Sequence, residues 1–407
     1  MKKRVHLKSH ILKASLGLLT IASFLIVIFQ TNTWGIESPQ RNDNQGIGVN
    51  KDILMGIDLL YNEQFNDAET LFQNVIVKSP DKPIGYFYLA MVTWSRMAAG
   101  FWSPETVREY KKRIDRTIQV AKSRINSNIA DSYDFFYLGG ALGFKGRFEL
   151  MKENWLSSFF LARNAIEAFR TCLKMNPDNK DALLGFGTFD YYTAHLSGLL
   201  KFLTYLLVHK GGKEEGLRKL HLAAEDAVYS ATEAKSMLIH IYLFVEEDLV
   251  KALKLADDLA EKYRQSPRYR ILLGVCYIRL GMEREYRDTV NLLRQKSLQT
   301  GTLNEACRWE RRALYLETVY DLYHRHYRDA RSKLEVIIKG QDPIKDPEMV
   351  AWPLLKIAMS YDLEGNREEA IKYYHRVLDM KNGAGAQFLA KKLLEDPPKN
   401  NDPFIGY

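Results

Sequence analysis

Apolar residues recur along most of the chain at steps of three and four positions, the spacing that places them on one face of an α-helix. The pattern is clearest in LLKIAMSYDLEGNREEAIKYYHRVLDM. Here Ile357 and Ala358 belong to a first helix and Gly365 opens a turn, whereas Ala370 and Tyr374 lie on the inner face of a second helix. No long run alternates polar and apolar residues, so we expect almost no β-strand.

The same pair of helices recurs from Lys51 onward at a period in the mid-thirties, which is typical of a solenoid of stacked repeats. Each first helix carries an apolar residue followed by a small one. Each second helix carries Ala, then an aromatic residue or Leu, then a small apolar residue. The copies include Met55, Gly56, Ala68, Phe72, Val75 and Pro80, then Leu138, Gly139, Ala165, Phe169, Cys172 and Pro177, and further on Leu273 and Gly274. Two helices approach to about 8 Å only where the residues between them are small, so we expect these glycines and Gly187 at helix crossings.

These positions resemble the hallmark positions of the tetratricopeptide repeat, a helix-turn-helix unit of about 34 residues. The resemblance covers most of residues 51–382 and is weakest from about 283 to 325. It implies an all-α fold, in which the helix pairs stack into a right-handed superhelix. We expect this solenoid to span residues 51–395 and to be followed by a flexible tail at 396–407, where prolines surround polar residues.

The stretch HLSGLLKFLTYLLVHKGG, residues 195–212, is more apolar than its surroundings. Residues 196–208 would form a helix of about 20 Å, which is too short to span a bilayer, so we expect an inserted helix packed on the array. Together with GFGTFDYY before it and GGKEEGLRKLHLAA after it, the insertion is similar to a region of tetratricopeptide repeat protein 39 and of the inclusion-body clearance proteins. That resemblance implies an interaction role near membranes and no known chemistry.

Lys2, Lys3, Arg4, Lys8 and Lys13 precede an uncharged apolar stretch at residues 14–29. This order predicts an export signal within residues 1–35, either cleaved or retained as an anchor to the inner membrane through residues 11–29. Residues 36–50 are polar and predict a linker. The folded body would then lie outside the cytoplasm, in the periplasm or its equivalent. Since those five residues account for most of the net charge of +8, nothing indicates nucleic-acid binding.

Glycine (25) and proline (12) are scarce, whereas Tyr (23) and Phe (19) are abundant, and this favours packed helices. The three cysteines lack the spacing of a disulfide framework or a metal site. The sequence contains no phosphate-binding glycine loop, nucleophile elbow or HExxH motif. Asp190 and His195 could in principle do acid-base chemistry, but no nucleophile accompanies them. We therefore expect no enzyme activity, no cofactor and no metal.

Tetratricopeptide repeats bind partners along their concave face, so the resemblance implies a binding site at the matching positions. These are Phe87, Met91 and Trp94 in the second repeat, Phe136 and Phe144 in the third, Tyr191 and Tyr192 in the fourth, then Arg268, Arg279 and Trp352. The resulting groove, aromatic at first and basic later, would suit a peptide with apolar anchors and an acidic group. The same rings could equally be core. The alternative function is binding of a lipid or other apolar ligand in a central pocket near residues 196–208.

Overall fold

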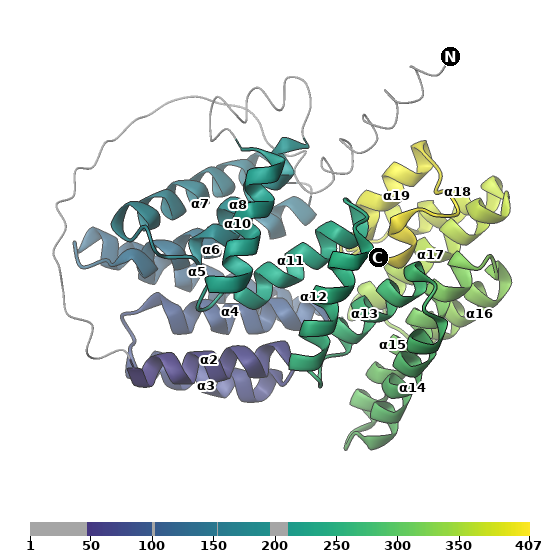
Figure 1. Ribbon diagram of the computed structural model, residues 1–407, viewed down its shortest axis with the longest axis horizontal. Helices are drawn as coiled ribbons and strands as arrows, with labels where there is room; N and C mark the ends of the chain where they lie inside the picture. The colour runs from purple at the N-terminus through teal and green to yellow at the C-terminus, as the bar shows by residue number, and fades with distance from the viewer. Residues whose placement is uncertain (1–46, 100–101, 153, 196–210) are drawn as a thin grey trace, which may run out of the picture. The chain divides into compact units, whose positions relative to one another are not determined.

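The computed structural model describes residues 47–99, 102–152, 154–195 and 211–407 (Figure 1). Over these residues the chain is helical and contains no strand, which confirms the predicted all-α fold. The predicted signal or anchor at 1–35, most of the predicted linker and the apolar insertion at 196–208 lie outside the described residues. None of the described helices is both long and apolar enough to cross a membrane.

The described helices fall into two compact units. The first unit comprises residues 47–60, 64–94 and 108–235, and the second comprises residues 61–63, 95–107 and 236–407. The helices that lie wholly or mostly in the first unit are α2 (Ile47–Tyr61), α3 (Phe65–Lys78), α4 (Pro83–Ala98), α5 (Pro104–Asn126), α6 (Ser132–Met151), α7 (Trp155–Met175), α8 (Ala182–Ala194) and α10 (Lys213–Asp226).

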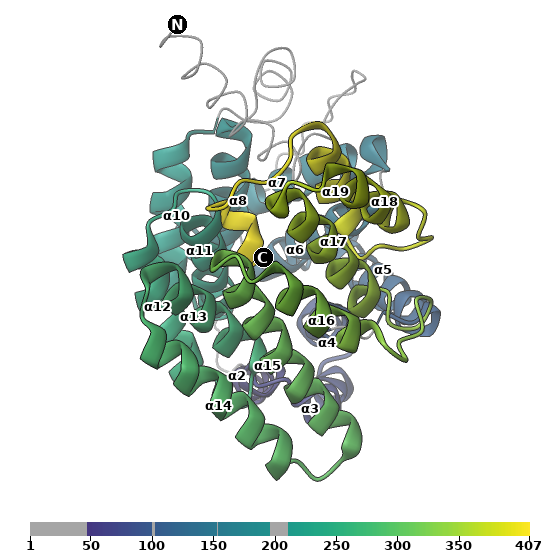
Figure 2. The ribbon, with the colours of Figure 1, turned by 90° about the vertical axis from the view of Figure 1, so that its right-hand side faces the viewer.

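The second unit contains most of α11 (Ala231–Phe244), then α12 (Leu249–Lys262), α13 (Pro267–Leu280), α14 (Glu283–Gln299), α15 (Leu303–Tyr323), α16 (Tyr327–Ile338), α17 (Glu348–Glu364), α18 (Arg367–Leu378), α19 (Ala386–Glu395) and the short 3-10 helix η1 (Pro403–Gly406). Each helix from α12 to α19 packs on the next one, and Figure 2 shows α14 and α15 side by side. Helix α13 also contacts α15, and α17 contacts α19. Contacts to the next helix and to the next but one are what stacked helix pairs require, since each pair buries its apolar face against its neighbours.

The helix ends follow local sequence signals. Asp131 begins α6 with a capping box, because its side chain accepts from the Asp134 N–H while the Asp134 side chain accepts from the Asp131 N–H. Gly281 and Gly365 end α13 and α17 in the left-handed conformation, with φ of 71° and 89°. Other residues rarely adopt this conformation, which explains why glycine follows the first helix of both pairs.

The glycines predicted at helix crossings lie there. A Cβ added at Gly56 would be 2.5 Å from the ring of Phe72, one at Gly139 would be 2.7 Å from Phe169, and one at Gly274 would be 2.4 Å from Leu316. At the crossing of α8 and α10 the neighbour is a backbone atom, because a Cβ at Gly187 would be 2.9 Å from the carbonyl oxygen of Gly216. The prediction of small residues at these positions is confirmed, and the close approach of the helices is its physical reason.

Candidate functional site

The predicted aromatic groove of the first unit consists largely of buried side chains. Phe87 and Met91 on α4 are each 6% exposed, Phe136 on α6 is 5% exposed, and Tyr191 on α8 has no exposed surface. The Phe87 ring packs on Tyr137, with ring centroids 5.3 Å apart. These four residues contribute to the core of the unit, so a partner could reach them only if helices moved.

Trp94, Phe144 and Tyr192 are the partly exposed members of the predicted groove in this unit. The Trp94 ring lies 5.4 Å from the Phe144 ring, and the guanidinium of Arg147 lies over Trp94 at 5.4 Å from the ring centroid. The two rings meet edge to face, and both retain some accessible surface beside the cation. A role for these three residues in partner binding stays a prediction.

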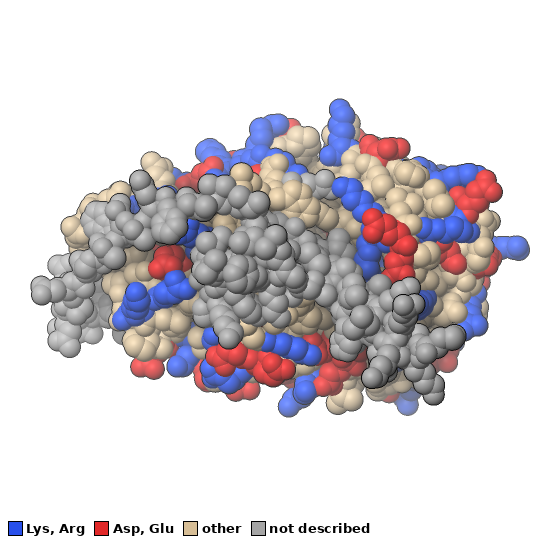
Figure 3. Space-filling view, turned by 90° about the horizontal axis from the view of Figure 1, so that it is seen from above, with Lys and Arg blue, Asp and Glu red and all other residues tan. Residues whose placement is uncertain are grey.

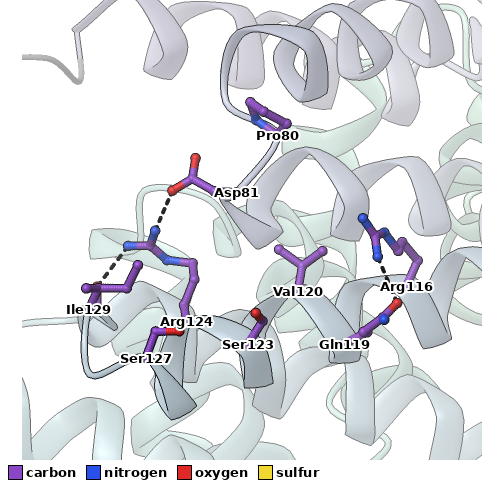
Figure 4. Close-up of a pocket in the computed structure, with 9 residues that line it drawn as sticks. All are labelled: Pro80, Asp81, Arg116, Gln119, Val120, Ser123, Arg124, Ser127 and Ile129. Carbon is purple, nitrogen blue, oxygen red and sulfur yellow. Dashed lines mark hydrogen bonds and ion pairs between the residues drawn. The ribbon is translucent and has the colours of Figure 1, made fainter.

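A surface pocket of about 220 Å³ lies beside α5 (Figure 4). Its lining residues are Pro80, Asp81, Arg116, Gln119, Val120, Ser123, Arg124, Ser127 and Ile129, none of which the sequence analysis selected. Arg124 donates from Nε to both carboxylate oxygens of Asp134 at 3.0 Å, from one terminal nitrogen to Asp81 at 2.6 Å, and from the other to the carbonyl of Ile129 at 2.9 Å. Because two carboxylates neutralise its charge, Arg124 acts as a joint between α5 and the start of α6.

A buried carboxylate organises a second polar region of the first unit. Asp181 accepts hydrogen bonds from the backbone N–H groups of Tyr229 at 2.8 Å and Ser230 at 2.7 Å. The hydroxyl of Tyr133 lies 3.5 Å from the other carboxylate oxygen. Burial raises the pKa of Asp181, and it also raises the pKa of Tyr229 to about 12. The carboxylate therefore ties the turn before α8 to the start of α11, a structural role.

Asp190 and His195, the acid-base candidates, have other partners. The Asp190 carboxylate accepts from Lys219 Nζ at 2.5 Å, and Nδ1 of His195 lies 2.8 Å from the carbonyl oxygen of Tyr191. No group of His, Cys, Asp and Glu side chains that could hold a metal ion occurs within residues 47–99, 102–152, 154–195 and 211–407. On the face drawn in Figure 3, Lys and Arg are interspersed with Asp and Glu across the coloured residues.

The two predicted basic residues of the second unit contact other parts of that unit. Arg268 donates to the hydroxyl of Ser236 at 3.1 Å. Arg279 donates to the carbonyl of Leu243 and, at 2.9 Å, to the Glu247 carboxylate. Both arginines that the sequence suggested for recognition of an acidic group therefore bind residues of the chain itself.

Residues 402–407, which belong to the segment predicted as a flexible tail, lie against inward-facing side chains of the second unit. Lys356 on α17 has no exposed surface, and its Nζ donates to the carbonyl oxygens of Phe404 at 2.6 Å and Ile405 at 2.8 Å. The Tyr323 hydroxyl on α15 donates to the carbonyls of Asp402 at 3.1 Å and of Pro403 at 3.2 Å. The Tyr315 hydroxyl donates to the carbonyl of Tyr407. Three side chains from two helices thus donate hydrogen bonds to the main chain of one short segment.

Rings and a glycine complete this contact. The Tyr407 ring lies 5.1 Å from Trp352 and 5.2 Å from Phe244, and the Phe404 ring stacks on Phe244 at 6.0 Å. A Cβ on Gly406 would lie 2.6 Å from a methyl of Val275. Ile405 has no exposed surface. We call the receiving residues, Phe244, Val275, Tyr315, Tyr323, Trp352 and Lys356, the inner groove of the second unit.

Of the predicted site residues, Trp352 belongs to the inner groove. Sequence reasoning missed Lys356, Tyr315 and Tyr323. The sequence offered one signal for this site, which is Lys356 itself. It is the charged residue within the apolar run AWPLLKIAM, and a charged residue on a buried helix face usually has a specific partner. Burial lowers the pKa of Lys356 to about 7, while Asp402 acts in the opposite direction.

A second buried ionisable group lies on the same helix, at its first turn. Burial raises the pKa of Glu348 to about 7, although Arg312 and Arg268 favour its charged form. Within the described part of the chain, one Glu348 carboxylate oxygen is buried and accepts no hydrogen bond. Helix α17 therefore carries an acid and a base that both titrate near neutral pH.

The profile of the tetratricopeptide repeat family matches residues 354–380, which cover most of α17 and α18. Among solved structures, yeast Tom70 is similar at 11% identity with a TM-score of 0.41, covering 86% of this chain and 90% of that one. The C-terminal part of a repeat-containing protein from Cytophaga hutchinsonii is similar at 13% identity with a TM-score of 0.26, covering 83% and 99%. The repeat domain of P58(IPK) is similar at 16% identity with a TM-score of 0.23, covering 84% and 89%. A search of curated proteins gave no significant match. The family match thus assigns a tetratricopeptide repeat to residues 354–380, and the described part of the chain around them is all-α.

Proposed function

We propose that this chain is a binding scaffold of the tetratricopeptide type, whose second unit holds a peptide segment of a partner protein and catalyses no reaction. The observation that carries the proposal is the inner groove, in which a lysine and two tyrosines donate to the main-chain carbonyls of residues 402–407. Carbonyl groups in a row are the feature that all peptides share, so such donors suit a polypeptide ligand.

The side chains around these donors support the same proposal. Phe244 and Trp352 offer aromatic surface to the rings at positions 404 and 407, and aromatic anchors contribute much of the binding free energy at protein interfaces. Val275 leaves room only for a glycine at position 406. The groove therefore combines main-chain recognition with a few selective side-chain positions, a combination suited to a peptide with apolar anchors.

We also propose that the scaffold acts outside the cytoplasm, exported or anchored to the inner membrane through residues 11–29. Its support is the sequence alone, where basic residues precede the uncharged residues 14–29. The resemblance of the region around residues 195–212 to tetratricopeptide repeat protein 39 and the inclusion-body clearance proteins supports an interaction role near a membrane.

Photo-cross-linking from the full chain tests the binding function. A benzoylphenylalanine in place of Trp352 probes the inner groove, and the same residue in place of Val336, which is 59% exposed on α16, is the matched control. We expect a discrete adduct with another protein from position 352 and none from position 336. Adducts of equal yield from both positions, or no intermolecular adduct from position 352, would contradict a partner site in the groove.

A further inference from the structure

The groove recognises a small number of features, all within six residues of the chain. Lys356, Tyr323 and Tyr315 bind carbonyl groups, which any residue supplies. Selectivity comes from the ring at 404, the buried Ile405, the glycine at 406 and the ring at 407. A six-residue segment of another protein with the same features could make the same contacts.

The six residues also hold their own shape. The Asp402 carboxylate accepts from the Phe404 N–H at 2.9 Å and begins the 3-10 turn of η1. Pro403 at the first position of this turn fixes the backbone before the aromatic residue. A segment that forms this turn by itself loses little conformational entropy on binding.

The segment is joined to α19 by a short, mostly exposed connection. Pro397, Lys399, Asn400 and Asn401 are exposed, and the hydroxyl of Tyr327 donates to Asn400 at 2.9 Å. A ligand attached through a short linker experiences an effective concentration in the millimolar range. The tether therefore favours the chain's own segment over a competitor of equal intrinsic affinity.

Lys356 makes an empty groove unfavourable. Both of its described acceptors, the carbonyls of Phe404 and Ile405, belong to the segment. If the segment left without a replacement, a fully buried amino group would lose these acceptors until water entered. Exchange of one peptide for another retains the two hydrogen bonds, so the groove discriminates between peptide ligands and ligands without carbonyl groups.

We propose that residues 402–407 are a built-in competitor for the inner groove, displaced by a partner segment that has an Asp or Asn, a proline, an aromatic residue, an aliphatic residue, a glycine and a second aromatic residue in this order. The proposal rests on the peptide-binding function proposed above and names the ligand chemistry of that same groove. Occupation by the chain's own segment lowers the apparent affinity for the partner by the factor set by the tether.

Competition between the tethered segment and a free peptide tests the proposal. The probe is a fluorescein-labelled synthetic peptide of residues 399–407, titrated with the full chain and read by fluorescence polarisation. Gly406→Val prevents docking of the tethered segment by collision with Val275 but leaves the groove residues unchanged. Asn401→Val, at an exposed position of the same connection, is the matched control.

We expect the G406V chain to bind the probe at least tenfold more tightly than the unaltered chain and the N401V chain, which should be alike. Adding Lys356→Met to G406V should abolish the gain, because the buried donor to the carbonyls of positions 404 and 405 is lost. A probe in which glycine is replaced by valine should bind none of the chains tightly. Thermal unfolding monitored by circular dichroism establishes that each variant is folded, and Gly406→Ala, whose Cβ meets the same methyl of Val275, replaces Gly406→Val if that variant does not fold.

Equal affinity of G406V and N401V for the probe would overturn the competitor proposal. A concentration-dependent dimer of the unaltered chain that G406V abolishes would also overturn it, since the occupant would then be the segment of a second copy. The two proposals fail differently. A partner adduct at position 352 with no gain in G406V leaves peptide binding standing, whereas the absence of both results removes the two proposals together.

Discussion

The crossing of α8 and α10 makes a sharp prediction about one methyl group. A Cβ added at Gly216 would lie 2.5 Å from the backbone nitrogen of Tyr191, 2.8 Å from its Cα and 2.9 Å from the carbonyl oxygen of Gly187. These are backbone atoms, which cannot rotate away as a side chain can. Gly216→Ala must therefore separate the two helices or distort one of them.

The magnitude follows from two opposing terms. Overpacking of a close contact costs about 1–3 kcal/mol, and rigid backbone neighbours place this site in the upper part of that range. Alanine regains up to about 1 kcal/mol over glycine inside a helix. We therefore expect G216A to lower the free energy of unfolding by about 1–2 kcal/mol. The separation would also disturb the ion pair between Lys219, one turn further along α10, and the buried Asp190.

Gly143→Ala is the matched control, because Gly143 lies inside α6 and an added Cβ there meets no atom within 4 Å. This variant should be more stable than the unaltered chain by about 0.5–1 kcal/mol. Urea unfolding of the full chain, followed by circular dichroism, compares the midpoints of the transition. If G216A were as stable as G143A, the close crossing of α8 and α10 would be refuted.

The two buried ionisable groups of α17 predict opposite pH dependences. The pKa of Glu348 is raised from 4.5 to about 7, so the free energy of unfolding falls as pH rises between these values. Glu348→Gln should remove that fall when urea midpoints are measured from pH 4 to 8. The pKa of Lys356 is lowered from 10.5 to about 7, so the free energy of unfolding rises with pH between these values. Lys356→Met should flatten the rise between pH 7 and 10. Arg124→Ala should cost about 3–5 kcal/mol in urea unfolding, because it leaves the buried carboxylate of Asp134 without its cation, whereas the additional change Asp134→Asn should recover part of the loss.

At the candidate site, the residue pattern predicts the helix face of a side chain but not its burial. Trp352 was predicted from its repeat position and contacts Tyr407, whereas the first-unit rings at the same kind of position are divided between core and surface. Phe87 and Trp94 are seven residues apart on α4, yet the first is buried by Tyr137 and the second retains accessible surface beside Arg147. Spacing assigns a residue to a helix face. It does not tell how much of that face the neighbouring helices cover.

The sequence by itself determined the helix pairs, their turns and the small residues at their crossings, as at Gly365 and Gly274, because a helical period and the space between adjacent helices are properties of nearby residues. Only the tertiary structure decided that Lys356 meets the carbonyls of Phe404 and Ile405, and that Asp181 accepts from the N–H groups of Tyr229 and Ser230, just before α11. These contacts join residues nearly fifty positions apart through generic backbone groups. Backbone groups carry no sequence signature, so their partners are fixed by the packing of the helices.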